Sequence, residues 1–143
     1  MADTLHSLVT QRSRLQYVFT DKHHGGGKRD DACWSVTREE EYFVFDLADG
    51  LELYDEAGRL YGALRNDEGS LRELGTKQEQ IAEFTGSIGG PWHGYPVWSL
   101  NESGASNRAA QKARTSKLVF VKMELKGLIT TGQRRRLMKG DHV

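Results

Sequence analysis

The stretch EYFVFDL, residues Glu41–Leu47, decides the fold class. In an extended chain its Phe and Leu side chains would all lie on one face, a pattern typical of a half-buried strand. Two turn dipeptides follow, Asp49-Gly50 and Ala57-Gly58, and each separates short alternating segments. These signals predict a small antiparallel β-meander over about residues 32–64.

Helical signals follow the predicted meander. Thr76, with Glu79 three residues later, has the spacing of a capping box, in which each side chain bonds the other residue's backbone N–H. Such a helix would have Ile81, Ala82 and Phe84 on its apolar side. We therefore expect an α+β domain, in which helices and an aromatic loop cover one face of the meander.

The segment LVFVKMEL, residues Leu118–Leu125, fits two structures. As a helix it places Leu118, Val121 and Leu125 on one face, and as a strand it places alternate apolar residues on one face. We favour the helix, because Gly127 occupies the position of a left-handed C-terminal cap. A second capping box, formed by Thr130 and Gln133, predicts another short helix that ends near Gly140. Two short helices around such a turn are helix-turn-helix-like.

Charge divides the chain. Residues 105–143 contain ten Lys or Arg and two acids, whereas residues 1–104 contain ten bases and eighteen acids, so the net charge of zero is a cancellation. We therefore expect a single domain over 1–143, with a basic helical C-terminal subregion at 105–143. Such asymmetry indicates a polyanionic or acidic partner.

The basic subregion supplies the first candidate site. Its predicted contacts with nucleic acid or an acidic protein are the cationic side chains Arg108, Lys112, Arg114, Arg134, Arg135, Arg136 and Lys139. Arginine forks suit phosphate oxygens, and several such contacts give affinity without sequence preference. The same cationic side chains could instead bind an acidic protein surface, or could form a surface that only contacts solvent. All three interpretations stay open. Few Asn or Gln side chains are present, so base-specific recognition is not expected.

The second candidate is the aromatic segment GGPWHGYPVW, residues Gly89–Trp98. Trp92, His93, Tyr95 and Trp98 could form a ligand or partner loop, because Trp and Tyr combine flat faces with a polar tip. The alternative, which we favour, is that they pack as a lid over the core. His93 is the most suggestive acid–base residue, but a structural role fits it better.

A metal site and a membrane span both lack support. His23, His24, Asp30 and Asp31 carry ligand-type side chains, but adjacent histidines diverge and the spacing of a helical or zinc-finger pair is missing, so we expect no metal and no cofactor. Cys33 is the only cysteine, which excludes an internal disulfide and fits a reducing cytoplasm. No apolar run approaches the roughly 18 residues that a membrane span requires.

Together these patterns predict a small cytoplasmic, non-catalytic binding protein that engages nucleic acid or an acidic protein through its basic C-terminal helices. One alternative is a small hydrolase or nuclease with His93 as the acid–base group. Another is a structural or immunity-type interaction domain that blocks a partner by shape. The oligomeric state is not indicated by the sequence.

Overall fold

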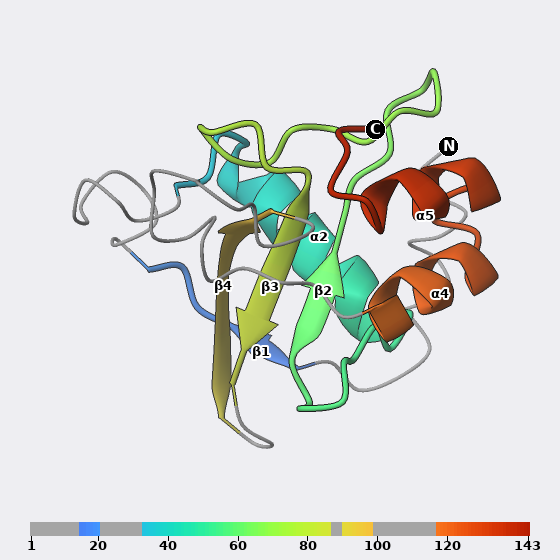
Figure 1. The fold of residues 1–143 in the computed structure, drawn as a ribbon. Coiled ribbons are helices and arrows are strands. Elements are labelled where there is room, and N and C mark those ends of the chain that lie inside the picture. Colours follow the sequence, from blue (N-terminus) through green and yellow to red (C-terminus); the bar gives the residue numbers. More distant parts are fainter. Residues whose placement is uncertain (1–14, 21–32, 87–89, 99–116) are drawn as a thin grey trace.

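A four-stranded mixed sheet lies at the centre of the molecule (Figure 1). The computed structural model describes residues 15–20, 33–86, 90–98 and 117–143. The elements, in chain order, are β1 (Gln16–Tyr17), α2 (Arg38–Gly50), β2 (Leu60–Gly62), β3 (Ile81–Thr85), β4 (Pro91–Val97), α4 (Lys117–Leu125) and α5 (Thr131–Leu137). The strand order is β1-β4-β3-β2, with β1 parallel to β4 and the other pairs antiparallel. The expected α+β class is confirmed.

The predicted meander over 32–64 is wrong, because EYFVFDL lies within α2. Thr37 is the N-cap of this helix. Its Oγ1 accepts a hydrogen bond from the Glu40 N–H at 3.1 Å, and Glu40 Oε1 accepts one from the Thr37 N–H at 2.9 Å. Acidic residues fill the first turn, where the helix dipole favours negative charge. This capping box, rather than the alternation of apolar residues, determines the local structure.

The second half of α2 is buried. Val44, Phe45, Leu47 and Ala48 are all buried and contribute to the core, and the helix lies behind the sheet in Figure 1. Gly62 of β2 makes the close contact possible, since a Cβ at that position would lie 2.7 Å from Val44 Cγ1 and 2.9 Å from the Val44 carbonyl oxygen. The meander residues outside α2 contribute only β2 and isolated bridges.

The helix predicted after Thr76 is also wrong. Residues 76–78 form a turn in which Gln78 has a φ of 68°, and Glu79 Oε1 accepts a hydrogen bond from the Lys77 N–H. Ile81, Ala82 and Phe84 belong to β3, where they are buried by the sheet and α2. The aromatic segment is likewise a strand and not a loop: β4 pairs with β3 from Thr85↔His93 to Ile81↔Val97.

The helix prediction for 118–125 is confirmed, and so is the cap at Thr130. Thr130 Oγ1 accepts a hydrogen bond from the Gln133 N–H, while the Gln133 side chain accepts one from the Thr130 N–H. Gly127 has a φ of 79°, as a left-handed cap requires. In Figure 1 both helices lie beside β2. The buried residues of the two helices and of the turn between them join the same hydrophobic core as α2 and the sheet: Val119, Phe120, Met123, Leu128, Ile129 and Leu137.

None of the helices within the described ranges has the length and apolar character needed to cross a bilayer.

Candidate interaction surface

Helix α4 has apolar side chains on two opposite sides. Val119, Phe120 and Met123 point into the core. Leu118, Val121 and Leu125 point outward, with 39%, 39% and 79% of their surfaces exposed. The spacing i, i+3, i+7 aligns these three side chains in one stripe along the helix. We call them the α4 stripe. The sequence groups them correctly on one face, and the structure shows that this face is turned away from the core.

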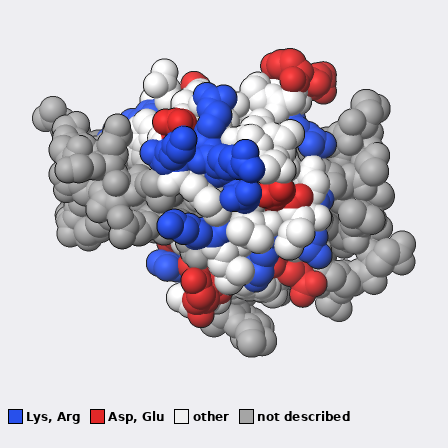
Figure 2. Space-filling model, turned by 45° about the vertical axis from the view of Figure 1, so that its right-hand side comes forward, with Lys and Arg blue, Asp and Glu red and all other residues white. Residues whose placement is uncertain are grey.

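Cations surround the α4 stripe. Residues 117–143 contain seven Lys or Arg against two acids, a net charge of +5. Lys117 and Lys126, at the two ends of α4, are exposed, as are Arg135, Arg136 and Lys139 on and after α5. Figure 2 brings this side of the molecule forward and shows Lys and Arg side chains gathered across it, with acidic side chains scattered between and around them.

Several of these cations are already engaged within the molecule. Arg134 forms a salt bridge with Glu124, whose other oxygen accepts a hydrogen bond from Thr131 Oγ1 at 2.5 Å. The hydrogen bond from the Thr131 hydroxyl and then the Arg134 guanidinium lower the pKa of Glu124. This carboxylate is therefore ionised at neutral pH and already bound to these two side chains. Lys122 Nζ donates to the Tyr54 carbonyl at 2.9 Å. These contacts hold α4, α5 and the segment before β2 together.

Other cations remain available to a partner. Arg135 and Lys139 form neither a hydrogen bond through their side chains nor a salt bridge with any part of the chain that the structure describes. Arg136 donates one hydrogen bond to the His142 carbonyl at 2.8 Å, which leaves its charge uncompensated. Of the predicted basic residues, Arg108, Lys112 and Arg114 lie outside the described residues, as do His23, His24, Asp30 and Asp31.

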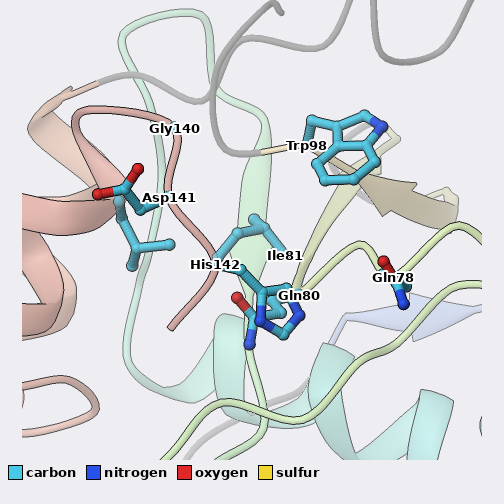
Figure 3. Close-up of a pocket in the computed structure, with 8 residues that line it drawn as sticks. Gln78, Gln80, Ile81, Trp98, Gly140, Asp141 and His142 are labelled. Atoms are coloured by element: carbon cyan, nitrogen blue, oxygen red, sulfur yellow. The ribbon is translucent and has the colours of Figure 1, made fainter.

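The four aromatic-segment candidates do not converge on one site. Trp92 is buried in the core. His93 and Tyr95 lie on the other face of β4 from Trp92, and on that face His93 is exposed. Trp98 lines a small hollow at the end of β4 with Gln80, Asp141 and His142 (Figure 3). Two of its polar residues are engaged internally: Gln80 bonds the Leu71 carbonyl and the Val143 N–H, and His142 lies 3.1 Å from Glu73. The buried Trp98 Nε1–H has no hydrogen-bond partner among the described residues.

A polar network on the sheet was missed by the sequence analysis. Strand pairing aligns Tyr61, Glu83 and Tyr95 on one face, and Glu83 accepts hydrogen bonds from both tyrosine hydroxyls, at 3.2 and 3.0 Å. Tyr61 Oη also lies 3.2 Å from Asp55 Oδ2, which is paired with Arg59. Only strand register brings these residues together, so no local sequence signal could have indicated the network.

The surroundings shift the pKa values of three groups in this network, Asp55 and the two tyrosines. Burial, and then the neighbouring carboxylates, raise the pKa values of Tyr61 and Tyr95, so both hydroxyls stay neutral donors. Burial opposes ionisation of Asp55, but hydrogen bonds from the Arg59 and Ala57 N–H groups and the Arg59 guanidinium lower its pKa. Each carboxylate is thus engaged by donors of the protein itself.

Among the residues that the structure describes, His93 has no partner for acid–base chemistry. It pairs across strands with Thr85, and its side chain has no hydrogen-bond or ion-pair partner in the described ranges. Over those same residues, no three His, Cys, Asp or Glu side chains lie close enough together to hold a metal ion.

Comparison with known proteins adds no further assignment. The chain matches no family model, and neither the curated proteins nor the solved structures show a significant match.

Proposed function

We propose that the protein is a non-catalytic binding protein whose α4–α5 surface engages an acidic protein partner. The observation that carries this proposal is the combination, on one surface, of the exposed α4 stripe and cations without an acidic partner. Protein interfaces typically have an apolar centre and a polar rim. Exposed apolar side chains that cluster, unlike isolated ones, indicate an interaction site.

An acidic protein fits this surface better than nucleic acid does. Phosphate contacts need cations, but Leu118, Val121 and Leu125 interrupt the cationic surface and would find no apolar counterpart on a phosphate backbone. Helix α5 has seven residues. Its amide side chain, Gln133, is used by the N-cap and by a 2.7 Å hydrogen bond to the Gly69 carbonyl, so it is not available to read a base.

Catalysis has weaker support. General acid–base chemistry requires a titratable group that is held against a partner. His93 is exposed and unpaired within the described residues, and the nearby Tyr95–Glu83 pair is fully engaged in the polar network. A protein that blocks its partner by shape is one form of the binding function proposed here.

Selection from a displayed random-peptide library on the immobilised full chain tests the proposal. We expect the recovered peptides to carry net negative charge and to lose binding to an Arg135→Glu/Lys139→Glu variant. For the single reversal Arg135→Glu, the matched control is Arg38→Glu, a charge reversal at an exposed arginine in the first turn of α2, where an acid is tolerated. Recovery of neutral or basic peptides, or equal loss with the control variant, would contradict the proposal.

Binding of a random DNA duplex across a salt series completes this test. We expect weak binding that Leu125→Gln does not change. Tight duplex binding that falls steeply with salt, combined with no enrichment of acidic peptides, would overturn the protein-partner proposal in favour of nucleic acid.

A further inference from the structure

The shape of the α4 stripe restricts what can bind it. Leu118 and Leu125 are seven residues apart, so the stripe extends about 10 Å along the helix axis. It projects from the surface of a helix, with Leu125 exposed over 79% of its surface. A projecting row of side chains is accommodated best by a complementary groove, and the rows of side chains on a second helix provide such grooves.

The cations around the α4 stripe restrict the charge of that second helix. Lys117 and Lys126 lie at its two ends, and both are exposed. On one side Arg135 of α5 is close enough to Glu124 to lower the pKa of that carboxyl, although Arg134 and Thr131 are its direct partners. A helix on the stripe would therefore meet positive charge at both ends and along one flank.

We infer that α4 is the docking site for an acidic amphipathic helix of the partner protein. The apolar face of that helix packs on Leu118, Val121 and Leu125, and its flanking Asp and Glu side chains face Lys117, Lys126 and Arg135. Anchors at i, i+3 or i+4, and i+7 would span the stripe, which is the spacing that amphipathic helices use on apolar surfaces. This inference rests on the proposed function and specifies the partner's structure.

A second copy of this chain fits the site less well. If two α4 helices packed through their stripes, Lys117 and Lys126 of one copy would lie near Lys117 and Lys126 of the other. Such like-charge contacts are unfavourable. Helix α2 has an acidic first turn, but its apolar face is buried in the core, and Tyr42 is its only exposed large apolar residue. The described residues therefore offer no acidic helix with a free apolar face.

Two synthetic peptides of about 18 residues and identical composition test the inference. In the first, Leu residues at i, i+4 and i+7 form one face with Glu on both flanks. In the second, the same residues are arranged so that the Leu side chains are spread around the helix. We expect the full chain to bind the first peptide at least tenfold more tightly at 0.15 M salt, with a negative heat-capacity change that marks apolar burial.

Variants then locate the contact. Val121→Gln and Leu125→Gln should each weaken binding of the first peptide roughly five- to tenfold, because each removes apolar surface from the interface while leaving the charges unchanged. The matched control is Val18→Gln in the segment after β1, the same substitution at a valine that is exposed to a similar extent. This control should leave the affinity unchanged.

The outcomes separate the inference from the function on which it rests. Equal binding of both peptides, with loss on Arg135→Glu, would overturn the helix-docking inference and leave the acidic-partner proposal standing. Binding of neither peptide, together with no acidic peptides from the library, would overturn both. A dimer in sedimentation experiments that Leu125→Gln dissociates would show that the stripe binds a second copy, which also overturns the inference.

Discussion

Helices α2 and α4 contribute to the same core, yet they distribute their apolar side chains differently. In α2 every residue from Val44 to Asp49 is buried, and the first turn contains three acids, of which Glu39 is exposed and Glu41 is buried. In α4 one apolar side packs inward and the other, the α4 stripe, remains exposed among lysines. Burial on all sides of its second half makes α2 a source of stability, whereas the exposed stripe of α4 contributes little to folding and fits a binding role.

The largest expected effect compares these two helices directly. Phe45 of α2 is buried against Tyr17 and Phe84, with ring centroids 4.7 and 5.2 Å away. Phe45→Ala should lower the free energy of unfolding by about 3–5 kcal/mol, since it leaves a cavity. Leu125→Ala in α4 should change it by less than about 0.5 kcal/mol. Urea denaturation measures both, and a large loss for Leu125→Ala would show that the stripe serves folding.

The turn between α4 and α5 gives the next effect. Gly127 has a φ of 79°, and a Cβ at this position would meet no atom within 4 Å, so any cost of substitution comes from the backbone. Gly127→Val should therefore lower stability by roughly 1–2 kcal/mol, since side chains disfavour the left-handed region. Gly132→Ala, inside α5, is the control and should stabilise by up to about 1 kcal/mol. A neutral Gly127→Val would mean that this turn does not depend on the left-handed conformation.

Three Thr-x-x-Glu/Gln sequences show how far sequence predicts this fold. The Thr130–Gln133 box predicts a helix, and α5 confirms it. The signal of the Thr37–Glu40 box is obscured, because EYFVFDL satisfies both the strand and the helix period over seven residues. The Thr76–Glu79 box predicts a helix where none exists, since strand pairing with β2 and β4 determines the structure of Ile81–Thr85. Local spacing thus suffices only where tertiary contacts agree with it.

The candidate site shows the same limit. The sequence places Leu118, Val121 and Leu125 on one helical face, but Val119, Phe120 and Met123 form an equally apolar opposite side. Hydrophobicity does not decide which side faces the core; the contacts of the whole domain do. The sequence alone shows that cations are concentrated in this part of the chain. It does not show that Arg134 pairs with Glu124 while Arg135 remains available, because that depends on the three-dimensional structure.

The three Thr residues provide a graded test of local capping. Thr37→Ala and Thr130→Ala each remove a side-chain acceptor from a helix N-terminus, and each should cost about 0.5–2 kcal/mol. Thr76→Ala removes no cap and should stay within about 0.5 kcal/mol of the wild type. Thermal unfolding compares all three, and an equal cost for Thr76→Ala would mean that the cap hydrogen bonds of α2 and α5 are not the cause of the losses.

The mildest expected effect contrasts two carboxyl groups, one in the core and one on α4. Glu79 is fully buried, with Oε2 unpartnered, and burial raises its pKa above the ordinary value of 4.5. An unfolded chain loses this proton at lower pH than the folded chain, so the folded state becomes less stable as pH rises from about 4.5 through the higher folded pKa. Glu79→Gln should therefore be more stable than the wild type at pH 7, and the gain should vanish below pH 4.5.

The pKa of Glu124 is lowered instead, so the contribution of Glu124 to folding stability has the opposite sign and is lost on acidification. Urea midpoints of the Glu79→Gln and Glu124→Gln variants between pH 3 and pH 8 measure both trends. A stability difference for Glu79→Gln that does not change with pH would show that this carboxyl does not ionise differently in the folded and unfolded chains.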